Sequence, residues 1–160
     1  MNIEVLSRKE LCNLTLGRNE KVAIISITDK HTYFTEIAAR NARQMLFVRF
    51  NDVEQEDIGC ITNNEANIIN AFVDSLENVD KIIVSCDGGV SRSPAVAASI
   101  MLKLGQNDKS IWENGKYSPN MTVFKTMIKS IFGETEASLI DIKTREQTSI
   151  ATWKQANDID

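Results

Sequence analysis

One stretch of the chain gathers residue types that can attack and bind a tetrahedral oxyanion. Lys81–Pro94 reads K-I-I-V-S-C-D-G-G-V-S-R-S-P, an apolar run that ends at Cys86 and leads through two glycines to Arg92. A thiolate is a strong nucleophile. A guanidinium offers a planar pair of donors to a phosphate or sulfate. We therefore interpret this stretch as a candidate site where a thiol attacks phosphorus.

The local structure expected around Cys86 suits anion binding. The apolar run predicts a buried strand, and Ser93-Pro94 predicts the start of a helix, so the loop between them lies at a sheet edge and a positive helix end. Gly88 and Gly89 let the backbone turn so that successive N–H groups converge on one point. These dipoles and the Arg92 guanidinium would favour the thiolate form of Cys86. The predicted phosphate cradle consists of Asp87, Gly88, Gly89, Val90, Ser91 and Arg92.

An acidic run upstream offers a proton donor for the departing oxygen, which is a poor leaving group when unprotonated. The run F-N-D-V-E-Q-E-D-I follows a predicted strand that ends at Phe50. Its first carboxylate, Asp52, is our choice of general acid, with Asp57 as the fallback. The alternative is that the run is a solvated loop before a helix.

The bulk properties indicate one globular domain. The chain has 160 residues, 42% of them hydrophobic, and a formal net charge of -4. This charge argues against general binding to nucleic acid or to an anionic membrane. No apolar window is long enough to span a bilayer, and three widely spaced cysteines fit a reducing compartment. We expect a cytoplasmic protein with no metal site.

The hydrophobic pattern predicts an α/β fold: one domain with a central, mostly parallel sheet flanked by helices. Apolar runs predict strands at Val22–Ile27, Met45–Phe50 and Ile82–Val84. Helical spacing follows Thr62-Asn63-Asn64, Ser93-Pro94 and Pro119-Asn120. Residues 1–133 would form the main body of the domain. Residues 134–160 are polar and would form either a final helix or a tail.

The motif C-x-x-x-x-x-R-S, from Cys86 to Ser93, resembles the signature loop of cysteine-based protein tyrosine phosphatases. The runs S-R-S-P-A-V-A-A-S-I and K-Y-S-P-N-M-T-V-F are similar to bacterial and phage members of the small dual-specificity-like branch. The resemblance extends from Val22 to Phe132 and is strongest from Ile82 to Leu104.

The resemblance implies hydrolysis of a phosphomonoester through a cysteinyl-phosphate, without a cofactor. Cys86 would be the nucleophile and Asp52 the general acid, while Arg92 would stabilise the phosphoryl oxygens and Ser93 would donate to the sulfur as it leaves. The implied substrate is protein phosphotyrosine, with phosphoserine, phosphothreonine and small phosphomonoesters as further candidates. Asn120 is either a helix cap or a support for the loop.

Two residues depart from the family pattern. Ser85 stands where the family commonly has histidine, and Asp87 places a negative charge beside the nucleophile. A phosphate-binding pseudophosphatase is therefore the alternative to an active enzyme, and a redox or sulfur-transfer enzyme is a third class. Cys12 and Cys60 are interpreted as packing residues, the alternative being a protective disulfide with Cys86.

Overall fold

A parallel sheet forms the centre of the protein in the computed structural model, which describes residues 1–32, 40–55 and 58–159. Within those residues the sheet has four strands in the order β1-β4-β2-β3, and every pairing is parallel. The strands are β1 (Asn2–Ser7), β2 (Val22–Thr28), β3 (Gln44–Arg49) and β4 (Lys81–Cys86). The α/β prediction with a flanked central sheet is confirmed.

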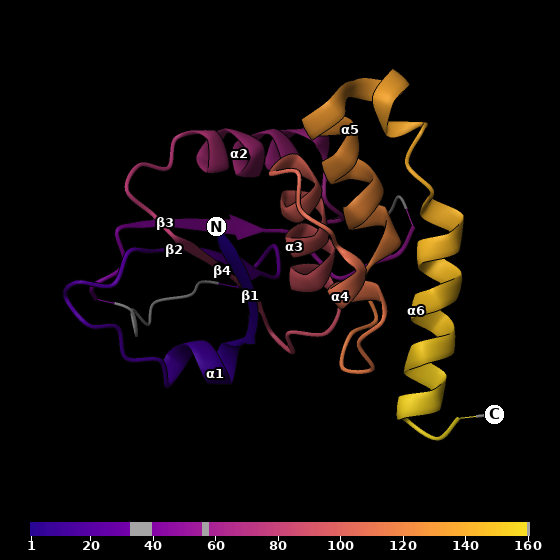
Figure 1. Cartoon of the computed structure of the whole chain (residues 1–160), viewed down its shortest axis with the longest axis horizontal. Coiled ribbons are helices and arrows are strands. Elements are labelled where there is room, and N and C mark those ends of the chain that lie inside the picture. Colours follow the sequence, from indigo (N-terminus) through magenta and orange to yellow (C-terminus); the bar gives the residue numbers. More distant parts are fainter. Residues whose placement is uncertain (33–39, 56–57, 160) are drawn as a thin grey trace.

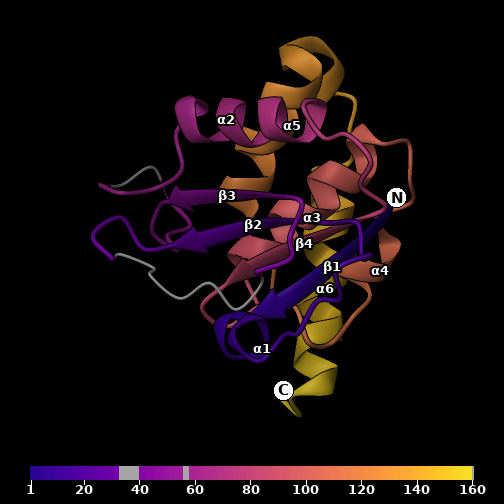
Figure 2. The ribbon, with the colours of Figure 1, turned by 90° about the vertical axis from the view of Figure 1, so that its left-hand side faces the viewer.

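Helices cover both faces of this sheet (Figures 1 and 2). Their bounds are α1 (Arg8–Cys12), α2 (Asn63–Asp74), α3 (Arg92–Lys103), α4 (Lys109–Trp112), α5 (Met121–Ala137) and α6 (Ile142–Ala156). Ile25 and Ile27 of β2 pack into the larger core with α2, α3 and α5, whereas Ile24 joins Leu11 of α1 in a smaller core. Because side chains alternate across a strand, β2 must be apolar on both faces.

Two of the three predicted helix starts agree with observed caps, whereas α3 begins at Arg92, one residue before Ser93, and its N-cap, Ser91, makes no side-chain capping hydrogen bond. Thr62 caps α2 in a capping box with Glu65. The Asn120 side chain accepts a hydrogen bond from the backbone N–H of Val123 and so caps α5. Gly105 follows α3 at a φ of +71°, the left-handed conformation that commonly ends a helix. These signals are local, since each depends on residues within one helical turn.

Strand β1 was absent from the sequence prediction. It is an edge strand that reads N-I-E-V-L-S, with no apolar run longer than two residues, so its apolar signal is weaker than that of the other edge strand, β3, which contains M-L-F-V. It pairs with β4 in a register that aligns Val5 with Val84 and Ser7 with Cys86. The N-terminal segment therefore lies beside the candidate nucleophile.

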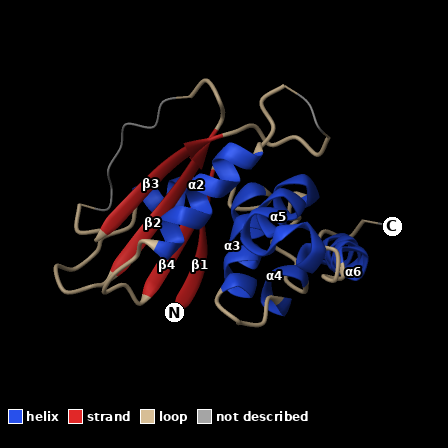
Figure 3. Cartoon of the chain, turned by 90° about the horizontal axis from the view of Figure 1, so that it is seen from above, coloured by secondary structure: helices blue, strands red, loops and turns tan. Residues whose placement is uncertain are grey.

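The polar segment 134–160 contains the end of α5 and the whole of α6. Helix α5 has a break at Gly133, where φ is +79°. Helix α6 is the element farthest from the sheet (Figure 3). Of the two alternatives for this segment, the structure supports the final helix. No helix among the described residues is long and apolar enough to cross a membrane.

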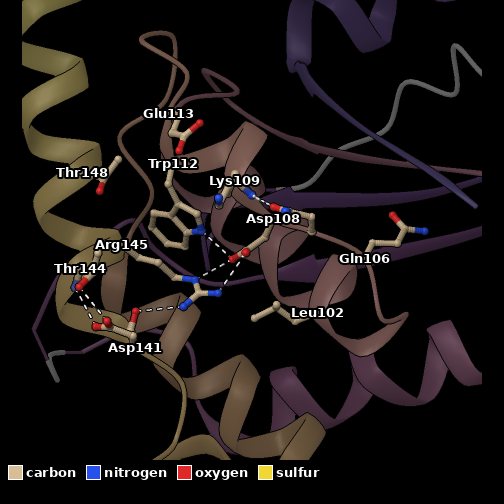
Figure 4. A pocket seen from close by; sticks show the side chains of 11 residues that line it. Leu102, Gln106, Asp108, Lys109, Trp112, Glu113, Asp141, Thr144, Arg145 and Thr148 are labelled. Carbon is tan, nitrogen blue, oxygen red and sulfur yellow. Dashed lines mark hydrogen bonds and ion pairs between the residues drawn. The ribbon is translucent and has the colours of Figure 1, made fainter.

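A buried carboxylate attaches α6 to the domain (Figure 4). Asp108 is almost fully buried and accepts hydrogen bonds from Trp112 Nε1 at 2.7 Å and from Arg145 Nε and Nη2 at 2.8 and 3.0 Å. Trp112 in turn packs edge-on against Phe124, with 4.9 Å between ring centroids. A cavity of about 420 Å³ borders this cluster, whose charged groups are already paired with one another.

We expect Asp108→Ala to lower the free energy of unfolding by about 3 kcal/mol, because it leaves Arg145 and Trp112 without their buried acceptor. Urea denaturation would measure this loss. The control is Asp74→Ala, which breaks the exposed ion pair with Lys103 and should cost less than about 1 kcal/mol. Equal losses in the two variants would show that Asp108 does not anchor α6.

Candidate active site

Residues 87–91, here called the anion loop, connect β4 to α3 and pass close to β1. Gly89 has a φ of +65°, and a Cβ there would lie 2.8 Å from the backbone nitrogen of Ser7. A Cβ on Gly88 would meet only Val90, at 3.7 Å. Backbone conformation and space therefore require glycine at position 89, whereas position 88 has room for a Cβ.

The backbone of the anion loop is braced from outside but leaves donors unused. The carbonyl oxygens of Val90 and Ser91 accept hydrogen bonds from the N–H groups of Ser118 and Asn120, at 2.8 and 3.0 Å. Among the described residues, the N–H groups of residues 88–91 have no acceptor. A turn of unpaired N–H groups before a helix N-terminus is a suitable site for an anion.

The Cys86 thiol lies at the base of the anion loop and is 2% exposed. Its Sγ atom is 3.0 Å from the Ser93 hydroxyl, and the Ser93 backbone N–H donates to the sulfur at 3.4 Å. The structure thus brings together Cys86 and Ser93, the first and last residues of the motif C-x-x-x-x-x-R-S. Both contacts can stabilise negative charge on sulfur.

The Arg92 guanidinium is 4% exposed and is held by groups at the carboxyl ends of three strands. Its Nη1 donates to Asp29 Oδ1 at 2.7 Å and to the Phe50 carbonyl at 2.8 Å. Its Nη2 donates to Asp87 Oδ2 at 3.3 Å. The remaining nitrogen, Nε, is buried and has no hydrogen-bond acceptor among the residues that the structure describes. A buried donor without an acceptor is costly, so this edge of Arg92 is suited to an anionic ligand.

Cys86 and Arg92 line the same open pocket of about 590 Å³. Its other lining residues are Asp29, Asn51, Asp52, Asp87, Gly88, Val90 and Ser91. Sequence reasoning missed Asp29 and Asn51. Their position was a usable signal, because each follows a predicted strand closely and the carboxyl ends of parallel strands share one sheet edge.

The Asp52 carboxylate reaches this pocket and is fixed by two donors. Its Oδ1 accepts hydrogen bonds from the Ser91 hydroxyl and from Asn120 Nδ2, each at 2.8 Å. Asn120 Nδ2 also donates to the Val53 carbonyl at 3.0 Å. Asn120 thus caps α5 with its side-chain oxygen, fixes Asp52 with its side-chain nitrogen and contacts Ser91 of the anion loop with its backbone N–H. The fallback acid, Asp57, lies outside the described residues.

The Asp87 side chain turns toward Arg8, the first residue of α1. Arg8 Nη2 lies 2.6 Å from Asp87 Oδ1, and Arg8 Nε donates to the same oxygen at 3.0 Å. The charge beside Cys86 is therefore shared between two guanidinium groups, those of Arg8 and Arg92.

A capping box fixes the position of Arg8. The backbone N–H of Ser7 donates to Glu10 at 3.0 Å, and the Ser7 hydroxyl accepts from the Glu10 N–H at 3.1 Å. These hydrogen bonds, the backbone one first, lower the pKa of Glu10. The box therefore persists in mildly acidic solution and weakens only as pH falls through that lowered pKa.

The remaining candidates lie outside the pocket lining. His31 is exposed, and Cys12 and Cys60 are half-buried. In the part of the chain that is described, no group of three histidine, cysteine or acidic side chains is placed to hold a metal ion. No family model and no curated protein sequence matches this chain.

We expect Gly89→Ala to destabilise the protein by more than about 2 kcal/mol, because a left-handed alanine is strained and its Cβ would displace β1. Gly88→Ala is the matched control and should stay within about 1 kcal/mol of the unsubstituted protein. Urea denaturation would measure both changes. A tolerated Gly89→Ala would contradict the close approach of the anion loop to β1.

Proposed function

We propose that this protein is a phosphomonoester hydrolase of the cysteine-dependent tyrosine phosphatase type. The observation that carries the proposal is that Arg92 lines the same pocket as Cys86 while its buried Nε has no acceptor among the described residues. An anion at that nitrogen would also meet the unused N–H groups of the anion loop. Phosphate has the charge and the oxygens to fill this site.

The proposed first step transfers the phosphoryl group to sulfur. The Cys86 thiolate forms a bond to phosphorus while the bond from phosphorus to the ester oxygen breaks. Asp52 donates a proton to that oxygen, which leaves as an alcohol or phenol. Since Oδ1 of Asp52 already accepts two hydrogen bonds, Oδ2 is the oxygen that would hold the proton. Arg92 and the loop N–H groups stabilise the phosphoryl oxygens.

The second step releases inorganic phosphate. A water molecule attacks phosphorus and gives its proton to Asp52, while the bond between sulfur and phosphorus breaks. The Ser93 hydroxyl, 3.0 Å from Sγ, stabilises the departing thiolate. The cycle ends with Cys86 as a thiolate and Asp52 protonated, so it requires no metal and no redox cofactor.

The substrate class and the location belong to the same proposal. We favour protein phosphotyrosine in a dual-specificity-like site, with phosphoserine, phosphothreonine and small phosphomonoesters as further candidates. The site would act in the cytoplasm, where a buried free thiol such as Cys86 stays reduced.

A second candidate function is phosphate binding without turnover. The pocket is lined by three carboxylates, those of Asp29, Asp52 and Asp87. Their charge opposes a dianionic substrate and the thiolate alike. A pseudophosphatase would bind phosphate while its thiol remained protonated, and the dependence of iodoacetate alkylation of Cys86 on pH would distinguish the two functions.

We expect the protein to hydrolyse para-nitrophenyl phosphate between about pH 5 and 8. Cys86→Ser should abolish turnover because no cysteinyl-phosphate can form. Asp52→Asn should lower kcat by about 10²-fold to 10⁴-fold for an ester with a poor leaving group, because the proton donor is lost. Rapid acid quenching of the wild type should trap labelled phosphate on Cys86.

Cys60→Ser and Glu54→Gln are the matched controls, since neither side chain lines the pocket. Hydrolysis without a cysteinyl adduct would contradict the covalent mechanism. Absence of turnover in the wild type, with Cys86 still protected from iodoacetate by inorganic phosphate, would support the pseudophosphatase.

A further inference from the structure

Four side chains form a row of alternating charge along the edge of the pocket: Arg8, Asp87, Arg92 and Asp29. The ion pair of Arg8 with Asp87 is short, at 2.6 Å, and so is that of Arg92 with Asp29, at 2.7 Å. The central ion pair, between Asp87 and Arg92, is longer, at 3.3 Å. Asp87 is therefore bound more closely by Arg8 than by Arg92.

The central pair involves a nitrogen that a bound oxyanion would need. On a guanidinium, Nε and Nη2 form one edge, which binds two oxygens of a phosphate in parallel. Within residues 1–32, 40–55 and 58–159, Nε of Arg92 has no acceptor, and Nη2 donates to Asp87 alone. The Asp87 carboxylate, 53% exposed, can turn about its own side chain and is a competitor for this edge.

Arg8 is held so that it restrains Asp87. Its Nη2 also donates to the Ile27 carbonyl at 3.0 Å, and its backbone N–H donates to the Asp87 carbonyl at 3.2 Å. The pairing of Ser7 with Cys86 in the sheet places it at this point. Arg8 itself is absent from the pocket lining, so it would act on the ligand through Asp87.

We propose that Arg8 is a positioning residue that keeps the Asp87 carboxylate from closing fully on the ligand-binding edge of Arg92, where its contact with Nη2 stays long at 3.3 Å, and so sets the affinity of the site for phosphate. This inference rests on the proposed function, because it assumes that the ligand is a phosphate group. Without Arg8, Asp87 would pair fully with Arg92 and add an uncompensated negative charge beside the ligand.

The test measures the affinity for inorganic phosphate by titration calorimetry, and KM and kcat for para-nitrophenyl phosphate, at one fixed ionic strength. Arg8→Gln should weaken phosphate binding about threefold to tenfold. It should raise KM by the same factor while kcat changes less than about twofold, because Arg8 touches no reacting atom. Lys9→Gln, which removes the same charge from the neighbouring exposed position, should change neither constant.

The double variant R8Q/D87N decides between positioning and a merely structural role. Removing the competitor should restore phosphate affinity, so Asp87→Asn must improve binding more in the Arg8→Gln background than in the wild type. A double variant as weak as Arg8→Gln would overturn the inference. If Arg8→Gln fails to fold, Arg8→Lys is tested in the same cycle and should show a smaller loss with the same rescue.

Failure of this inference is separable from failure of the proposed function. A wild type that hydrolyses the ester while Arg8→Gln binds phosphate normally would overturn the role of Arg8 alone. A wild type that binds phosphate without turnover leaves the affinity cycle intact and rejects only the hydrolase. A wild type that neither hydrolyses the ester nor binds phosphate would overturn both.

Discussion

The burial of the Arg92 guanidinium is the constraint on which the site depends. A charged group in an apolar interior needs hydrogen-bonded partners, and Arg92 finds them at the ends of three strands: Asp29 after β2, the Phe50 carbonyl after β3 and Asp87 after β4. The parallel sheet directs all these ends to one edge. The Nε of Arg92 has no acceptor in the described part of the chain, and this is the reason that we propose an anion there.

The elements around Arg92 hold the anion loop in place from two sides. On one side, β1 lies so close to Gly89 that only glycine fits. On the other side, the backbone of Ser118 and Asn120 supports the loop carbonyls, and the Asn120 side chain fixes Asp52. The nucleophile and the candidate acid are therefore held by contacts made outside the motif. Preorganised donors of this kind do not need to rearrange when charge develops.

Sequence patterns predicted the parts of this structure that have short-range causes. The strands β2, β3 and β4 and the helices that begin after Thr62 and Asn120 follow from apolar spacing and capping residues. Strand β1 reads N-I-E-V-L-S and has no apolar run longer than two residues, which left it unpredicted. The polar composition of 134–160 left α6 undecided between a helix and a tail, because α6 is attached by the buried contact between Arg145 and Asp108 rather than by an apolar stripe.

The sequence by itself determined the strand, loop and helix that place Cys86, Arg92 and Ser93 together, because a fixed spacing within one short segment restricts where its side chains can lie. Only the tertiary structure decided that Asp29 holds Arg92 and that Arg8 holds Asp87. Those contacts depend on the strand order β1-β4-β2-β3. Strand order follows from the packing of the whole domain, and no local pattern encodes it.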